Sequence, residues 1–253
     1  MSIITLTTDF GTRDWFVGSM KGVILGVNPQ AIVVDITHEV PSGDIRAGAF
    51  ALAVSYRYFP RNTVHVAVVD PGVGSNRAAL VVKTADYYFV GPDNGVLSVA
   101  LAKEKVLEVW QAENQTYFRR PVSSTFHGRD VFAPMAAHVT TRVLMDSLGR
   151  KLKDYARLSW PMPQVVGGVL RGEIVYIDRF GNAISNIDSP ATSVSKVRVA
   201  DKVQCGIKRF YQEAPAGQPL AIMGSAGYLE IAVNGGNAAL ALGLKLGDIV
   251  EVA

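Results

Sequence analysis

The sequence has little cysteine, no dense cluster of basic residues and no long apolar run. Its single cysteine, Cys205, excludes an intrachain disulfide and any metal site built from several cysteines, which favours a reducing compartment. The 253 residues carry a formal net charge of only +3, and no basic stripe predicts nucleic-acid binding. No segment reaches the roughly 18 consecutive apolar residues of a transmembrane helix, and the N-terminus lacks the features of a secretion signal. We therefore expect a cytoplasmic protein without nucleic-acid or membrane partners.

Apolar residues, by contrast, are abundant. They make up 49% of the chain, which is enough for a large core. In the first part of the sequence, short apolar runs alternate with helical spacing of apolar residues. The pattern predicts strands at 3–7, 31–36, 64–69, 80–82 and 87–90, and helices at 16–27, 45–56 and 131–148. Near-continuous apolar strands between helices are typical of a parallel sheet that is covered on both faces.

The composition changes near residue 160, where a proline-rich stretch is followed by two glycines. From residue 169 onward, turns separate short β-rich runs at 173–178, 196–199, 219–223, 229–233, 238–242 and 248–252. This pattern predicts a small all-β barrel or sandwich. We therefore expect an α/β protein of two domains: an N-terminal α/β domain at 1–162 with a mostly parallel sheet, and a C-terminal β-barrel domain at 163–253.

Acidic residues follow the apolar runs of the first domain. Asp9, Asp70 and Asp93 each come soon after an expected strand, and Asp35 closes another. Because the carboxyl ends of parallel strands share one edge, where ligands bind, this rule places Asp9, Asp70 and Asp93 around one crevice. The alternative for any single aspartate is that it caps a helix or a turn.

A glycine-rich turn and a histidine add candidate chemistry. The turn at 70–77 lacks both the third glycine of a dinucleotide fingerprint and a Gly-Lys-Ser/Thr sequence, but it holds Asp70 and Arg77 in a fixed relation. His127 precedes an expected helix and is a candidate general acid or base. None of the four histidines has zinc-site spacing, so we expect no metal, although a divalent ion held by carboxylates and His127 stays open.

Seven short motifs occur in an order that resembles a known family. They are Thr8–Thr12, Asp35–His38, Val69–Gly74, Gly91–Gly95, Phe126–Asp130, Phe180–Asn182 and Gly224–Ser225. Together they resemble the S-adenosyl-L-methionine (SAM) hydroxide adenosyltransferases, or SAM hydrolases, which are related to the fluorinases and chlorinases. The resemblance covers essentially the whole chain.

The resemblance implies that water or hydroxide attacks C5′ of the adenosyl group in line, giving adenosine and L-methionine without a cofactor. It implies a homotrimer with sites at subunit interfaces. The implied catalytic residues are Asp70, Arg77 and His127. The implied substrate-binding residues are Asp9 for the ribose, Asn182 with Phe180 and Phe210 for adenine, Asp14 and Asp178 for the methionine ammonium, Ser225 for its carboxylate, and Phe126 and Gly128.

Other functions stay open at this stage. One alternative is a chlorinase-like halogenase. The fluorinase has a tyrosine where this chain has Asp70, and the carboxylate of Asp70 would repel an incoming halide, which favours hydrolysis. The fluorinase also has a serine in place of Gly128, and the halogenases have an arginine in place of Ala226. The remaining alternatives are a non-catalytic SAM or adenosine sensor and a metal-dependent phosphate esterase.

Overall fold

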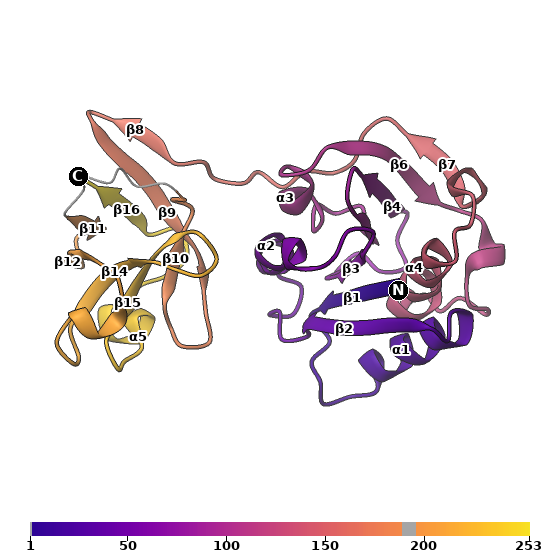
Figure 1. Cartoon of the computed structure of the whole chain (residues 1–253), viewed down its shortest axis with the longest axis horizontal. Helices are drawn as coiled ribbons and strands as arrows, with labels where there is room; N and C mark the ends of the chain where they lie inside the picture. Colours follow the sequence, from indigo (N-terminus) through magenta and orange to yellow (C-terminus); the bar gives the residue numbers. More distant parts are fainter. Residues whose placement is uncertain (1, 189–195) are drawn as a thin grey trace. The chain divides into compact units, whose positions relative to one another are not determined.

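The chain folds into two compact units, each with its own sheet. The computed structural model describes residues 2–188 and 196–253 (Figure 1). The first unit ends at Leu158 and the second begins at Ser159, whereas the sequence analysis placed the boundary between residues 162 and 163. Within the described ranges, none of the helices combines the length and apolar character that crossing a membrane requires.

The first unit is built on a mixed sheet with the strand order β2-β1-β3-β5-β4-β6-β7 (Figure 1). The strands β2, β1, β3 and β5 are parallel, and β4, β6 and β7 extend the sheet in antiparallel pairing. Their bounds are β1 (Ser2–Thr8), β2 (Ala31–Thr37), β3 (Val64–Val68), β4 (Ala79–Thr84), β5 (Tyr88–Pro92), β6 (Val106–Ala112) and β7 (Gly149–Leu152). The expected strands are confirmed with small shifts at their ends, while β6 and β7 were not predicted.

Helices cover both faces of this sheet. Two of the three predicted helices are confirmed as α1 (Phe16–Val27) and α2 (Ile45–Ser55). Ile4 and Leu6 of β1 belong to a buried cluster that α1 and α4 (Ala133–Thr140) complete on one face. The alternate residue Thr5 is hydrogen-bonded to His65, whose ring contacts Tyr56 at the end of α2. Side chains alternate across a strand, so α2 and the short α3 (Ser98–Leu101), which packs on it, cover the opposite face.

The predicted helix at 131–148 is wrong in its length. A π-helical turn spans Gly128–Phe132, and α4 ends at Thr140, two residues before Arg142, whose φ of 62° is not helical. The apolar spacing continues beyond that point because Met145 packs against the same core from a separate short 3₁₀ helix, Met145–Ser147. The buried Leu148 completes this arrangement.

The second unit is a β-sheet with the order β12-β11-β16-β9-β10-β15-β14-β13, and β8 pairs with β9 (Figure 1). Contacts between β12 and β14 nearly close it into a barrel around a core that includes Ile174 and Ile231. The bounds are β8 (Gln164–Val166), β9 (Val169–Ile177), β10 (Ala183–Ser185), β11 (Val197–Val199), β12 (Val203–Cys205), β13 (Ile207–Lys208), β14 (Pro219–Met223), β15 (Leu229–Val233) and β16 (Ile249–Val252).

One expected strand of this unit is a helix. Residues 238–242 form α5 (Ala238–Leu242), because the side-chain oxygen of Asn237 accepts a hydrogen bond from the backbone nitrogen of Leu240 at 2.8 Å and caps the helix. The backbone nitrogen of Ala239 donates to the carbonyl of Gly181 at 2.9 Å. The helix therefore supports the turn that carries Phe180 and Asn182.

Replacement of Gly181 by alanine should destabilise the second unit more than replacement of a comparable glycine. A Cβ at Gly181 would lie 2.0 Å from Cγ of Asn237, and φ is +83°. Gly235 has a similar φ of +73° but no atom within 4 Å of such a Cβ, which makes Gly235→Ala the matched control. We expect about 1 kcal/mol of lost unfolding free energy for the control and at least about 2 kcal/mol for Gly181→Ala, measured by urea denaturation. Equal losses would contradict the contact with Asn237.

Candidate active site

A cavity of about 380 Å³ opens in the first unit, where the parallel strands β1 and β3 end. The loop after β1 contributes Asp9 to its wall, and the turn after β3 contributes Asp70. The segment that precedes α4 contributes Phe126, His127 and Gly128. The structure thus brings five of the predicted site residues to one cavity, at the edge of the sheet where the sequence rule expects a ligand.

Arg77 connects Asp70 to His127 behind this cavity. Its Nε lies 2.9 Å from Oδ2 and 3.1 Å from Oδ1 of Asp70, and its Nη2 also donates to Oδ2. The same Nη2 lies 2.8 Å from Nδ1 of His127. The Asp70 side chain is only 4% exposed and that of Arg77 only 11%. A nearly buried ion pair is stable only if its remaining donors and acceptors also form hydrogen bonds. Here Nδ1 of His127 provides an acceptor for the guanidinium of Arg77.

The contact with Arg77 fixes the tautomer of His127. A guanidinium has only donors, so Nδ1 must accept this hydrogen bond and the ring proton of the neutral imidazole lies on Nε2. Burial lowers the pKa of His127, and the positive charge of Arg77 lowers it further, while the charges of Asp70 and Asp130 act in the opposite direction. The net shift is downward, so the imidazole is neutral at neutral pH.

The turn at 70–77 and the segment that carries His127 approach each other closely through their backbones. Gly74 has a φ of +80°, and a Cβ there would lie 2.3 Å from the carbonyl oxygen of Ser124. Only glycine allows the turn at 70–77 to lie this close to the segment that carries His127. The guanidinium of Arg77 also stacks over the ring of Phe132 at 5.0 Å, which fixes its plane.

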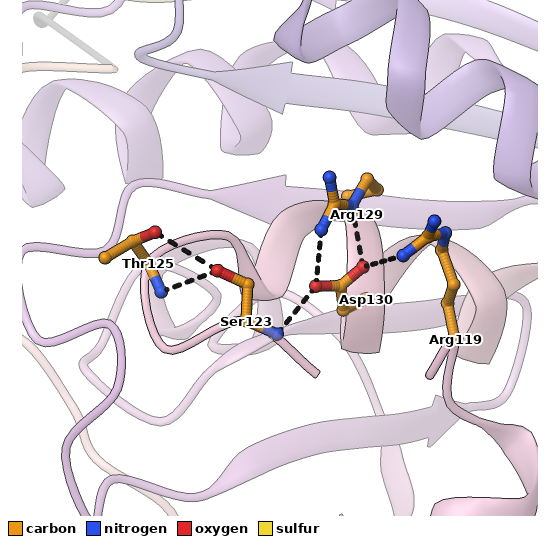
Figure 2. A network of polar contacts seen from close by, with 5 residues as sticks. All are labelled: Arg119, Ser123, Thr125, Arg129 and Asp130. Atoms are coloured by element: carbon orange, nitrogen blue, oxygen red, sulfur yellow. Dashed lines mark hydrogen bonds and ion pairs between the residues drawn. The ribbon is translucent and has the colours of Figure 1, made fainter. Parts of the chain in front are cut away.

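A second network holds the segment before α4 from the other side (Figure 2). The carboxylate of Asp130 is fully buried and accepts hydrogen bonds from Arg129 at 2.7 and 2.9 Å and from the backbone nitrogen of Ser123 at 2.8 Å. Arg119 lies 3.3 Å from the same carboxylate. Burial alone would raise the pKa of Asp130, but these donors hold it below its ordinary value. Asp130 is therefore the anchor of the loop next to His127.

The loop that carries Asp9 is also held by hydrogen bonds. Oδ2 of Asp9 accepts from the backbone nitrogen of Gly43 at 2.8 Å. The hydroxyl of the preceding Thr8 accepts from the backbone nitrogen of Phe10 at 3.2 Å and lies 2.8 Å from Nδ1 of the buried His38. Nε2 of His38 in turn lies 3.0 Å from the carboxylate of Asp35. The motif at 35–38 therefore supports the Asp9 loop and does not line the cavity itself.

Aromatic rings form the apolar part of the cavity wall. Phe126 packs edge-on against Phe10 at 5.8 Å and against Phe16 at 5.1 Å. A Cβ at Gly128 would lie 3.0 Å from the ring of Phe10, so a larger residue at this position would press on that wall. Sequence reasoning named Phe126 and Gly128 but missed Phe10, Phe16 and Thr125, which carry no charge or spacing signal of their own.

Two aspartates of the first unit lie away from this cavity. Oδ1 of Asp93 accepts from the backbone nitrogen of Ala156 at 2.7 Å, so it anchors the end of the unit, and its expected place in the crevice is wrong. Asp14 is exposed in the loop before α1 and is not among the described residues that line the cavity. Within the described ranges, no group of three histidine, cysteine, aspartate or glutamate side chains is arranged to hold a metal ion.

Three of the predicted site residues of the second unit, Asp178, Phe180 and Asn182, lie in one turn. Oδ1 of Asp178 accepts from the backbone nitrogens of Phe180 at 2.9 Å and Asn182 at 2.8 Å, and its Oδ2 accepts from the Asn182 side chain at 3.0 Å. Phe180 is 74% exposed and Phe210 is 50% exposed, and both rings offer apolar surface. Ser225 lies in the turn after β14.

Sequence reasoning missed a buried acid near this turn. Glu230 is 6% exposed and accepts a hydrogen bond from the hydroxyl of Tyr211 at 2.7 Å. Burial raises its pKa, and the charge of Asp178 raises it further. Its position in the middle of the apolar β15 gave no signal of this contact.

Comparisons with known proteins agree over both units. The SAM hydroxide adenosyltransferase N-terminal domain matches residues 4–149, and the C-terminal domain of the same family matches residues 172–251. A protein of Salinispora arenicola named (R)-S-adenosyl-L-methionine hydrolase is 39% identical over 98% of this chain and 97% of its own length. A Thermus thermophilus protein of the same name is 37% identical over the full length of both chains.

More distant relatives and a solved structure complete the comparison. A fluorinase of an Actinoplanes species is 28% identical over 99% of this chain and 97% of its own length. The crystal structure of a conserved protein from Thermotoga maritima superposes with a TM-score of 0.92 at 39% identity and covers 99% of each chain. The mixed α/β fold with a barrel-like second sheet is thus shared with a solved structure.

Removal of the guanidinium should raise the pKa of His127. In the native protein, burial and Arg77 keep this pKa below the ordinary 6.5. Arg77→Met removes a positive neighbour and leaves the negative charge of Asp70 unopposed, so the imidazolium becomes more stable. The measurement is an NMR titration of the histidine rings. His138, whose pKa is lowered by burial alone, is the internal control and should not move. An unchanged His127 titration would contradict the coupling to Arg77.

Proposed function

The chain belongs to the SAM hydroxide adenosyltransferase family, and on that premise we propose that it hydrolyses SAM to adenosine and L-methionine. The observation that carries the proposal is the cavity wall in which Asp70, Arg77 and His127 are joined by hydrogen bonds. The relatives at 35% to 39% identity that bear the name (R)-SAM hydrolase support the same reaction. From their name we further propose that the (R) epimer at sulfur is the preferred substrate.

The reaction requires mainly that the protein places the substrate and a water molecule in line and makes that water a good nucleophile. The oxygen of water forms a bond to C5′, and the C5′–S bond breaks with its electron pair going to sulfur. The sulfonium cation and water give adenosine, methionine and one proton. Because the leaving group is a neutral thioether, it needs no general acid. In-line placement of water in the cavity can contribute about 7–11 kcal/mol to lowering the barrier.

The hydrogen bonds in the wall assign distinct roles to the three residues in this proposal. Nδ1 of His127 is already occupied by Arg77, so the ring can donate from Nε2 and orient the water. Asp70 is the remaining acceptor in the triad and takes the proton as attack proceeds. Arg77 holds both groups and stabilises the negative charge that develops on the attacking oxygen.

The binding residues follow the family resemblance in this proposal. Asp9 would accept hydrogen bonds from the ribose hydroxyls, because its carboxylate is fixed by Gly43 at the cavity wall. In the second unit, Asn182 would bind the adenine edge, and the exposed rings of Phe180 and Phe210 would stack on the base. Asp14 and Asp178 would bind the methionine ammonium, and Ser225 its carboxylate.

The assembly and location are also part of the proposal. A homotrimer with sites at subunit interfaces would bring residues of the second unit to the substrate from a neighbouring chain. The support for it is the family resemblance in the sequence. A cytoplasmic location is supported by the single cysteine.

The proposed reaction is tested by incubating the protein with SAM in ¹⁸O-labelled water. The label should appear on the 5′ oxygen of adenosine, because water attacks C5′ directly. Mass spectrometry of the separated products is the measurement, with the two sulfonium epimers supplied in parallel reactions. Label in another product, or 5′-chloro-5′-deoxyadenosine as the main product in chloride, would refute hydrolysis. Intact SAM after long incubation would instead favour a binding protein.

The shared-water arrangement predicts a non-additive pair of mutations. Asp70→Asn and Arg77→Met should each lower kcat by about 10²–10⁴-fold, since each disturbs the same base, while the KM for SAM stays near the native value. The double variant should be little slower than the slower single one. Steady-state kinetics of the four proteins gives the result. Effects that multiply in the double variant would mean that the two residues act independently.

A further inference from the structure

The wall formed by Arg77 and His127 separates the main cavity from a second, smaller one. The second cavity has a volume of about 200 Å³ and lies in the same unit. His127 lines both cavities, Asp70 lines only the first, and Arg77 lines only the second. Because Arg77 donates to both other residues, the triad spans the partition from one cavity to the other. Among the residues that the structure describes, none of the proposed substrate-binding residues lines this second cavity.

We propose that this second cavity holds the water that replaces the nucleophile after each turnover. This inference rests on the proposed hydrolysis. An adenosyl group bound in the first cavity would cover the side of the triad on which Asp9 and the aromatic rings lie. Among the described residues, His127 is shared by the linings of both cavities, so its ring is where water of the second cavity would reach the position of the nucleophile.

The lining of the second cavity combines apolar side chains, among them Phe118, Val122 and Val131, with polar groups that can hold water. A volume of about 200 Å³ accommodates several water molecules, each of which takes up about 30 Å³ in the liquid. Gln111 and Gln115 supply polar walls, and arginines fix their amide oxygens, Arg150 at 2.8 Å and Arg120 at 2.8 Å. The charge of Arg77 is matched by Asp70, which disfavours an anion there.

One lining side chain of the second cavity is partly exposed and can be enlarged without overpacking the core. Val122 lines the cavity and is 39% exposed, so a larger residue there would narrow the cavity at this exposed side, which we call its mouth. Ala112, at the end of β6, is buried in the interior of the cavity wall. Leu107 lies on the same strand, is 47% exposed and is not among the described residues that line either cavity. These three positions give a mouth variant, an interior variant and a matched control.

The first test is kinetic and compares Val122→Ala, Val122→Trp, Ala112→Leu and the control Leu107→Trp. We expect kcat to fall roughly tenfold in Val122→Trp and Ala112→Leu, because water supply then limits turnover, with the KM for SAM unchanged. Val122→Ala and Leu107→Trp should keep the native kcat. An unchanged kcat in both narrowed variants would overturn the proposal. So would chloride inhibition of the native protein that Val122→Trp relieves, since a halide would then occupy the cavity.

The second test is structural and does not depend on turnover. A high-resolution crystal structure with adenosine and methionine should show ordered waters between Val122 and His127, and Ala112→Leu should displace them. A second cavity without water in the native protein would overturn the proposed water site even if the protein hydrolyses SAM. If the cavity holds water but the protein forms no adenosine, the proposed function is refuted. The water would then have no role in catalysis, so this inference would be overturned as well.

Discussion

The guanidinium of Arg77 is the interaction on which the arrangement of the first unit's cavity depends. It binds the carboxylate of Asp70 and the imidazole of His127 at once. His127 lies 50 positions after Arg77 in the sequence, on a different loop. The donors of Arg77 decide which nitrogen of His127 carries the proton. Burial lowers the pKa of His127, and the charge of Arg77 lowers it further, which keeps the imidazole neutral. The chemistry assigned to the other two residues therefore follows from the position of one arginine.

Two supports hold the loops around this arginine in place. Gly74 allows the turn at 70–77 to approach Ser124 closely, and the buried carboxylate of Asp130 draws together the backbone and side chains of the segment next to His127 (Figure 2). Neither support faces the cavity. Mutations at these positions would change catalysis through geometry alone, since the groups that react would be chemically intact.

Much of this arrangement was accessible from the sequence, for definable reasons. The short apolar run of β1 and the 3.6-residue spacing of α1 and α2 reflect local burial, so the elements were predicted where they occur. The acids after β1 and β3 were predicted at one edge because strand direction fixes it. The helix at 131–148 was predicted too long because Met145 and Leu148 pack on the core from beyond the end of α4. The contacts of Asp93 with Ala156 and of Glu230 with Tyr211 depend on residues distant in sequence, which spacing does not encode.

The reliance on two separate loops has a consequence for how the protein responds to heat or mild denaturant. The strands and helices of the first unit are held by a continuous apolar core, to which Phe126 belongs, whereas residues 119–125 are held mainly by polar contacts. Segments of that kind open locally at a lower free-energy cost than the core. Such an opening would remove the support of the loop before His127 and loosen its contact with Arg77 while the sheet stays folded. Activity would then decline ahead of the loss of circular dichroism, and inactivation would be reversible until the core itself unfolds.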